Sequence, residues 1–285
     1  MVAVVTPFSA DGSVDESALR DLVEWQIESG TDAIVATGTT GEGSTLSEGE
    51  RIAVWVTVID AVAGRVPVVC GSGTNDTRAS VAATKRAKAL GADGALVITP
   101  YYNKPSQAGL EAHFRAVASV GLPVVLYNVP GRTGVSLDLD TTLRLADVPE
   151  IVALKDATAD IALALEAKAR LGDRMLLLSG DDGSALPFWA AGGDGMISVT
   201  ANVAPHICAR SWDAFAAGDL AEARRLQERL MPLHRALFLE SNPIPLKSAL
   251  ALMGRCRGDL RLPLVPAADA TVERLRAVLT SLELV

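Results

Sequence analysis

Eight apolar runs of strand length, each followed by a helical pattern, predict an α/β fold: a TIM (β/α)8 barrel with a C-terminal helical region. A chain of 285 residues is long enough for one such barrel. Hydrophobic residues make up 49% of the chain and aromatic residues only 4%, so the interior should be aliphatic, as in parallel strands buried on both faces. An open, doubly wound sheet is the alternative that the same alternation allows.

The expected strands are short apolar runs rich in Val, Leu, Ile and Ala, separated by enough residues for a helix. They occupy residues 2–8, 33–38, 66–73, 94–100, 123–129, 151–157, 175–182 and 195–203. A strand that returns to the same sheet after a helix runs parallel to its predecessor, and eight such units are the number that closes a barrel.

Amphipathic segments fill the gaps between these strands, and several begin after a Ser, Asp or Asn that can cap a helix. They occupy residues 16–28, 48–62, 78–90, 108–120, 139–146, 161–171 and a short stretch at 184–191. Beyond residue 203 the alternation stops, and only helices are expected, at 205–217, 220–239, 244–253 and 270–282. We therefore expect a barrel over residues 1–217 and a helical region over 218–285 that packs on it.

Net charge and cysteine content argue against several classes of function. A net charge of −8 and a pI near 5.0 argue against a nucleic-acid or anionic-membrane surface. The three cysteines are scattered and lack metal-ligand spacing, which favours a reducing compartment without disulfides or a zinc site. No basic leader or membrane-length apolar run is present. We expect a soluble cytoplasmic enzyme with no nucleic-acid or membrane partner.

Lys155 ends an apolar run, Ile-Val-Ala-Leu-Lys, that has the length of a strand. Alternation along a strand places Ile151, Ala153 and Lys155 on one face, with the lysine at the carboxyl end. Burial disfavours the charged form of an amine, and a neutral amine can attack a carbonyl to form a Schiff base. The alternative is a lysine that reaches from the strand end into solvent.

Further polar residues follow the other expected strands, at the barrel end where catalytic residues of this fold lie. Thr39 and Thr40 stand in the loop Gly-Thr-Thr-Gly-Glu-Gly, whose glycines and hydroxyls suit a carboxylate better than a phosphate, although a plain tight turn is the alternative. Tyr127 should point the same way as Lys155 on the neighbouring strand, or be an ordinary buried tyrosine. Arg132, between two glycines, suits a second carboxylate, or is a surface arginine.

Other catalytic arrangements find no support in the sequence. The three histidines, His113, His206 and His234, all fall on expected helices, and no metal-ligand set, nucleotide-binding fingerprint or Ser/His/Asp arrangement is present. Metal-assisted aldol chemistry is therefore disfavoured, and amine catalysis remains.

Six motifs in order resemble those of the dihydrodipicolinate synthase/N-acetylneuraminate lyase family of class I aldolases. The resemblance extends over nearly the whole chain and is more specific than any single loop. The motifs are Gly-Thr-Thr-Gly-Glu at 38–42, Tyr-Asn-Val-Pro-Gly-Arg-Thr at 127–133, Leu-Lys-Asp-Ala at 154–157, Ser-Gly-Asp-Asp at 179–182, Gly-Met-Ile-Ser-Val-Thr-Ala-Asn at 195–202 and Glu-Ser-Asn-Pro-Ile-Pro-Leu-Lys at 240–247.

This resemblance implies a pyruvate-dependent Schiff-base aldolase. Lys155 would bind pyruvate as an imine, and the loop of Thr39 and Thr40 would hold the pyruvate carboxylate. The enamine formed by loss of a methyl proton would attack aspartate 4-semialdehyde, and ring closure onto the amine would follow. The family's chemistry needs no cofactor and no metal.

The resemblance also assigns supporting roles. Thr39, Tyr127 and Tyr102 match a proton relay, in which Tyr102 comes from the neighbouring subunit of a dimer. Arg132 matches an arginine that receives the carboxylate of the semialdehyde, and Gly180 and Ile197 match positions whose backbone carbonyls line the pocket. The expected assembly is a homotetramer, a dimer of dimers. Met1 stands close to the first expected strand, which leaves open whether a further N-terminal segment precedes it.

Two alternative functions stay open. A related Schiff-base aldolase or dehydratase could act on a keto-sugar acid, but such a substrate would favour more hydroxyl-binding side chains and no fixed cation at Arg132. A non-catalytic barrel could bind a keto acid as a sensor, but it would not need the relay of Thr39 and Tyr127.

We expect free lysine to inhibit this protein weakly or not at all. The resemblance places an effector site of lysine-inhibited relatives near Gly43, Ser44, Glu48, Arg51, Asn75, Ala79 and Tyr101. Asn75 and Tyr101 match those relatives. Glu48 and Arg51 stand where such relatives often have histidines, and Ala79 replaces a carboxylate that would pair the effector's amine. A buried ammonium without a partner is unfavourable. A lysine titration of the activity tests this expectation, and strong inhibition at sub-millimolar lysine would contradict it.

Overall fold

A computed structural model describes the whole chain, residues 1–285. The chain divides into two compact units. The first unit joins the two ends of the chain, Met1–Val68 and Ser198–Val285, and the second is the middle of the chain, Val69–Ile197.

The second unit is built around a parallel sheet whose strand order follows the chain order. Its strands are aliphatic, and Val97, Val124 and Leu126 are completely buried, as expected for strands covered on both faces. The strands are β3 (Val68–Gly71), β4 (Gly94–Ile98), β5 (Val124–Asn128), β6 (Ile151–Asp156), β7 (Leu176–Ser179) and β8 (Gly195–Met196).

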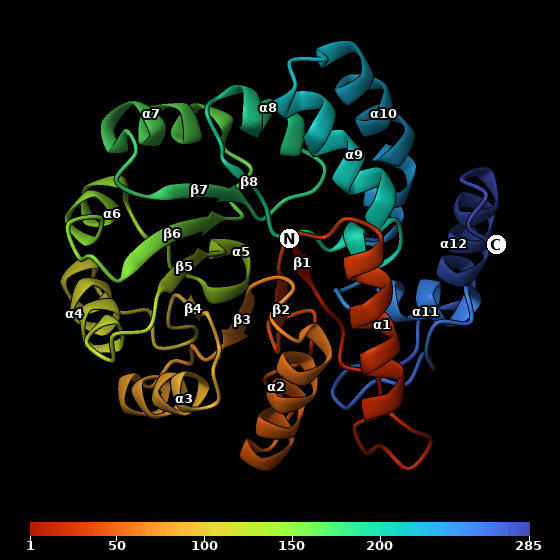
Figure 1. Cartoon of the computed structure of the whole chain (residues 1–285), viewed down its shortest axis with the longest axis horizontal. Coiled ribbons are helices and arrows are strands. Elements are labelled where there is room, and N and C mark those ends of the chain that lie inside the picture. The colour runs from red at the N-terminus through yellow and green to blue at the C-terminus, as the bar shows by residue number, and fades with distance from the viewer. The chain divides into compact units, whose positions relative to one another are not determined.

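Helices make the crossovers between these strands, and Figure 1 shows α3, α4, α6 and α7 along one side of the sheet. The helices are α3 (Thr77–Ala89), α4 (Gln107–Ala118), α5 (Pro130–Thr133), α6 (Leu139–Leu145), α7 (Ile161–Leu171) and α8 (Ala185–Ala190). Four of them begin after a side chain that accepts a first-turn backbone N–H, which satisfies a donor that the helix itself leaves unpaired. These N-caps are Asp76, Ser106, Asp138 and Asp160.

The first unit holds the N-terminal strands β1 (Val2–Ala3) and β2 (Ile34–Ala36), with helices α1 (Glu16–Glu28) and α2 (Glu48–Val62). β1 and β2 are parallel. The other edge of β1 pairs with Ser198, since the Ala3 N–H donates to the Ser198 carbonyl and the Ser198 N–H donates to the Met1 carbonyl, both at 3.0 Å. β1 is therefore an interior strand with partners on both edges, as every strand of a barrel must be.

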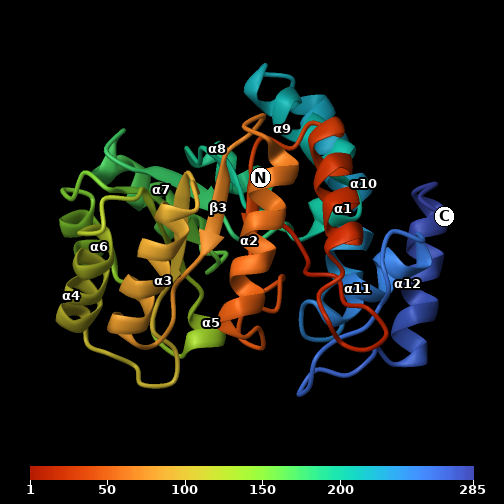
Figure 2. The same cartoon turned by 60° about the horizontal axis from the view of Figure 1, so that its bottom comes forward.

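The C-terminal part of the first unit is helical. It contains the 3₁₀ helix η1 (Thr200–Asn202) and helices α9 (Pro205–Ala216), α10 (Leu220–Ala236), α11 (Ile244–Leu252) and α12 (Asp269–Ser281). α10 packs against α9 and α12, and α11 and α12 lie side by side in Figure 2. The predicted boundary after residue 217 falls between α9 and α10 and stays a prediction. No helix combines the length and the apolar character needed to cross a membrane.

All eight strands are shorter than the sequence suggested, most of all those expected at 2–8 and 195–203, where the Asn202 side chain takes part. The run 195–203 was expected to be a strand throughout, but β8 ends at Met196 and η1 follows. The Asn202 side chain accepts the Val5 N–H at 3.1 Å and donates to the Ala3 carbonyl at 2.8 Å. An amide side chain thus satisfies backbone groups that would otherwise have been paired in a strand ladder, so the expected strand 2–8 contracts to Val2–Ala3.

Candidate active site

Lys155 and Tyr127 come together on adjacent strands of the second unit. They are register partners on β5 and β6, and the Lys155 amine lies 4.3 Å from the centre of the Tyr127 ring. Both are nearly buried, with 5% of Lys155 and 6% of Tyr127 exposed. The lysine therefore does not extend into solvent, and an amine and a phenol occupy one enclosed place at the carboxyl ends of parallel strands.

Gly180, just after β7, packs against the Lys155 side chain. A Cβ atom at this position would lie 3.1 Å from the lysine Cε and 2.8 Å from the Ala157 Cβ, so only glycine fits without displacement. The Gly180 N–H donates to the Asp156 carbonyl at 2.6 Å, and the Ile197 N–H donates to the Ser179 carbonyl at 2.9 Å. Backbone bonds thus fix Gly180 and Ile197 at the ends of the two strands that follow β6.

Arg132 lies on the short helix α5, which follows β5 directly. Its side chain is exposed, and the loop that carries it is anchored at two points. The Thr133 hydroxyl accepts from the Thr99 hydroxyl at 3.2 Å, and the Asn128 side chain accepts the Leu137 N–H at 3.0 Å. The arginine therefore presents an exposed cation on an anchored segment of backbone.

Tyr102 lies at the surface, unlike the buried Lys155 and Tyr127. It is 89% exposed and has a left-handed backbone with φ +73°. The side-chain amide of neighbouring Asn103 donates to the Asn75 carbonyl at 2.9 Å. This hydrogen bond connects the segment to the residues that precede α3. The chain therefore holds Tyr102 at the surface, where another subunit or a ligand could contact it.

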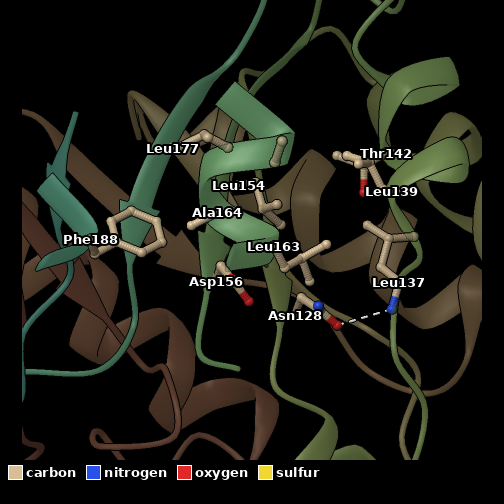
Figure 3. Close-up of a pocket in the computed structure, with 11 residues that line it drawn as sticks. Asn128, Leu137, Leu139, Thr142, Leu154, Asp156, Leu163, Ala164, Leu177 and Phe188 are labelled. Carbon is tan, nitrogen blue, oxygen red and sulfur yellow. Dashed lines mark hydrogen bonds between the residues drawn. The ribbon is translucent and has the colours of Figure 1, made fainter. Parts of the chain in front are cut away.

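A small cavity is lined by Leu154 and Asp156 of β6, among other residues (Figure 3). These two residues alternate with Lys155 along the strand, so the cavity lies on the opposite face of β6 from the lysine. Its volume of about 20 Å³ is enough for a single water-sized molecule and too small for a substrate. Burial raises the pKa of the Asp156 carboxyl, although two hydrogen bonds from Thr158 oppose that shift. The cavity therefore belongs to the packing between sheet and helices.

The Thr39 and Thr40 loop lies in the first unit and has a constrained backbone. Thr37 and Glu42, which flank it, both have left-handed conformations, with φ +54° and +51°. Such conformations are unfavourable for residues with a Cβ and persist where surrounding contacts hold them. A Cβ atom at position 43 would lie only 2.2 Å from the Thr37 carbonyl oxygen. Only glycine, which has no Cβ, therefore allows the two ends of the loop to come this close.

A buried ion pair holds the end of this loop. Glu42 pairs with Lys247 of α11 at 2.5 Å, and both side chains are almost completely buried. The Lys247 amine also donates to the Asp259 carbonyl at 2.9 Å and lies 3.9 Å from the centre of the Phe8 ring. Burial lowers the pKa of Lys247, while the Glu42 carboxylate opposes that shift. The loop conformation therefore depends on a charge supplied more than 200 residues later in the chain.

Arg261 adds a second connection between the C-terminal region and the residues around this loop. Its N–H donates to Glu42 at 3.1 Å, and its guanidinium binds Glu50 and donates to the carbonyls of Thr45 (3.1 Å) and Gly12 (2.7 Å). The Arg261 guanidinium, helped by the Ser47 N–H, lowers the pKa of Glu50 to about 2. Glu50 is thus an anion at neutral pH that fixes the start of α2 to the C-terminal segment.

Sequence reasoning did not identify the residues that support the loop. Glu42 and Lys247 belong to motifs quoted above, but nothing in the sequence indicated that they pair. Asn242, in the second of those motifs, donates from its side-chain amide to the Thr40 hydroxyl at 3.0 Å. Asn128 and Thr133, which anchor the Arg132 loop, were likewise not predicted to do so. A charged residue inside an otherwise apolar helix, as at Lys247, is the one signal that could have drawn attention.

The three histidines lie on helices, as the sequence predicts. His113, His206 and His234 lie on α4, α9 and α10. Cys70 is completely buried in β3, and burial raises its thiol pKa, as expected of a core residue. No group of three or more His, Cys, Asp or Glu side chains is arranged to hold a metal ion.

Sequence comparisons identify relatives over the full chain. Residues 1–282 match the sequence model of the Dihydrodipicolinate synthetase family. A 4-hydroxy-tetrahydrodipicolinate synthase of Geobacter sp. (strain M21) is 53% identical over 286 residues, which cover 100% of this chain and 98% of that protein. The enzyme of the same name from Rhodospirillum centenum is 50% identical, with 98% and 96% of the two chains covered.

Solved structures that are similar to this chain are also dihydrodipicolinate synthases. A chloride-inhibited dihydrodipicolinate synthase from Acinetobacter baumannii, complexed with pyruvate, is 48% identical with a TM-score of 0.98, covering 100% of this chain and 98% of that one. Dihydrodipicolinate synthase from Thermotoga maritima is 42% identical with a TM-score of 0.97, covering 100% and 98%. The predicted fold class, a TIM (β/α)8 barrel with a C-terminal helical region, is confirmed.

Replacing Lys247 should destabilise the protein strongly. In Lys247→Met the Glu42 carboxylate stays buried without its partner, so the free energy of unfolding should fall by about 3–5 kcal/mol. In Lys247→Met with Glu42→Gln both charges are gone, and most of that loss should be recovered. Denaturant unfolding measures both, with Lys88→Met, at an exposed lysine, as the control. A double variant no more stable than Lys247→Met would contradict the buried pair.

Gly180→Ala should also destabilise the protein, by about 1–3 kcal/mol, because the added methyl group meets the Ala157 Cβ. Gly131→Ala is the matched control, because a Cβ there meets nothing within 4 Å. Its free energy of unfolding should stay within about 0.5 kcal/mol of the parent's. Equal effects of the two substitutions, measured by the same denaturant titration, would show that Gly180 is not held against Lys155.

Proposed function

The chain belongs to the Dihydrodipicolinate synthetase family, and on that premise we propose that it catalyses the reaction of 4-hydroxy-tetrahydrodipicolinate synthase. In this reaction, which serves lysine and diaminopimelate biosynthesis, a lyase condenses pyruvate with L-aspartate 4-semialdehyde. The observation that carries the proposal is the buried Lys155 amine beside Tyr127 at the carboxyl ends of β5 and β6. Full-length relatives with that name, and a solved relative that holds pyruvate, support it.

Lys155 acts as the nucleophile. Its amine attacks the C2 carbonyl of pyruvate, and the carbinolamine loses water to give an imine. The imine withdraws electrons from the methyl group, which loses a proton to form an enamine. The enamine carbon bonds to the aldehyde carbon of the semialdehyde, whose oxygen takes up a proton and becomes the hydroxyl. The semialdehyde's own amine then attacks C2, closes the ring and releases Lys155. The electron sink is the lysine imine, so these steps require no cofactor and no metal.

We assign the role of proton carrier to Tyr127. Its ring faces the Lys155 Nζ, and a phenol in that place can pass a proton to and from the carbinolamine. The family resemblance adds Thr39 and Tyr102 to the same relay. The exposure of Tyr102 supports its donation to the site of a neighbouring subunit.

Two carboxylates need two sets of donors. The proposed donors for pyruvate are Thr39 and Thr40, whose loop is held in a strained, closed form. Arg132 is the proposed partner of the semialdehyde carboxylate, because its guanidinium is exposed on an anchored loop and can bind a carboxylate through two parallel hydrogen bonds. The backbone carbonyls of Gly180 and Ile197 complete the proposed pocket.

Neither alternative function has a specific observation in its favour. The relatives' names support the synthase over an aldolase or dehydratase for keto-sugar acids. The close approach of Tyr127 to Lys155 supports a catalyst over a barrel that only binds a keto acid, since binding alone needs no proton carrier.

The proposed assembly is a homotetramer arranged as a dimer of dimers. The exposed Tyr102 supports at least a dimer, because a catalytic role for it requires a second subunit. Analytical ultracentrifugation with activity measurements tests this, and a fully active monomer would contradict it.

The proposed location is the cytoplasm, which three cysteines outside any disulfide support. Recovery of the activity outside the cytoplasm in cell fractionation would contradict that location.

The parent protein should consume pyruvate and aspartate 4-semialdehyde together, as followed by NMR of both substrates. Lys155→Ala should lower kcat by at least about 10⁴-fold because no imine can form, and Tyr127→Phe by about 10²–10⁴-fold because the proton carrier is lost. Lys88→Ala is the control and should match the parent. Turnover of a keto-sugar acid but not of the semialdehyde, or full activity of Lys155→Ala, would contradict the proposal.

A further inference from the structure

We propose that Asn242 is a positioning residue that fixes Thr40 as a hydrogen-bond donor to the carboxylate of the keto-acid substrate. The inference rests on the proposed function and goes beyond it, because it places a determinant of substrate binding in the C-terminal region. The residues that carry it all belong to the first unit.

The direction of one hydrogen bond carries the first step. The Asn242 Nδ2 lies 3.0 Å from the Thr40 Oγ1, and both residues are buried, with 5% and 2% exposed. An amide NH₂ group can only donate, so the threonine oxygen accepts this bond. The hydroxyl proton of Thr40 must therefore point to another acceptor. A carboxylate offers only acceptor oxygens, and a threonine whose oxygen is already engaged presents its proton to such a ligand.

The loop's own hydrogen bonds supply the second step. The N–H groups of Gly41 and Gly43 both donate to the Gly38 carbonyl, and the Glu42 N–H donates to the Thr39 carbonyl. These donors close the loop and are not available to a ligand. The N–H and hydroxyl groups of Thr39 and Thr40 do not take part in these loop-closing bonds. The orientation of the Thr40 hydroxyl therefore determines whether it can donate to an anion bound at the loop.

The third step is that the segment carrying Asn242 is itself fixed to the same loop. Asn242 lies five residues before Lys247, whose amine pairs with Glu42. The Ile244 N–H donates to the Ser241 carbonyl at 2.8 Å, and the Lys247 N–H donates to the Pro243 carbonyl at 2.9 Å, so a turn and the first turn of α11 join the two contacts rigidly. The ion pair of Lys247 with Glu42 fixes the backbone at the end of the loop, and the hydrogen bond from Asn242 fixes the orientation of the Thr40 hydroxyl.

A double-mutant cycle on pyruvate binding tests the inference. Asn242→Ala should raise the KM for pyruvate about tenfold, the effect of losing one well-oriented hydrogen bond to a charged group, with kcat within about threefold of the parent. The KM for the semialdehyde should stay within about twofold. Thr40→Val should raise the pyruvate KM similarly, and adding Asn242→Ala to Thr40→Val should change it no further, because Asn242 acts only through that hydroxyl.

Controls separate this outcome from general damage to the fold. Ser248→Ala removes a hydrogen bond to the Ile244 carbonyl within the same helix and should leave both KM values unchanged. If Asn242→Ala does not fold, as judged by circular dichroism, Asn242→Ser replaces it, because the shorter side chain cannot reach Thr40 and should raise the pyruvate KM in the same way.

Three results would overturn the inference: a parent-like pyruvate KM in the folded Asn242 variant, additive effects of the two substitutions, or a loss confined to kcat. Failure of the proposed function looks different. In that case the parent protein itself forms no borohydride-reducible adduct with pyruvate, and the inference about Asn242 is lost with it.

Discussion

A lysine amine enclosed at the end of a buried strand is the constraint on which the rest of the site depends. Lys155 is nearly buried and lies against the face of Tyr127, its register partner on the next strand. An aliphatic strand tolerates such a group only where its neighbours leave room, and Ala153, Ala157 and Gly180 are small. The parallel sheet thus does more than support the site: strand register determines which side chain faces the amine.

The proposed reaction also requires a set of donors for a carboxylate, and the loop proposed for it is not held by local sequence alone. The loop of Thr39 and Thr40 is closed by its own N–H groups and strained at both flanks, so contacts from elsewhere must hold it. Those contacts come from the C-terminal region: Lys247 pairs with Glu42, and Asn242 donates to Thr40. The C-terminal region thus helps to fix the conformation of a loop that lies about 200 residues earlier in the chain.

Strands and helices, which repeat regularly along the chain, could be predicted from the sequence. Contacts between residues far apart in the sequence could not. The alternation of strand and helix and the pairing of Lys155 with Tyr127 follow from local rules, so helices with clear caps, such as α1 and α2, have the predicted bounds. The pairing of Glu42 with Lys247 joins residues about 200 positions apart, and no periodicity encodes it. The error at residues 195–203 has the same origin, since the Asn202 side chain replaces backbone pairing there. The roles in the reaction of all eight expected site residues stay predictions: Lys155, Tyr127, Thr39, Tyr102, Thr40, Arg132, Gly180 and Ile197.

The most direct measurement of the central claim is the intact mass of the protein after incubation with pyruvate and borohydride, followed by peptide mapping. Reduction converts an imine into a stable secondary amine, so the parent should gain the mass of one reduced pyruvyl group. That group should map to the peptide containing Lys155, and Lys155→Ala should gain nothing. An adduct on a different lysine would move the site away from β6. No adduct on an active parent would contradict imine catalysis altogether.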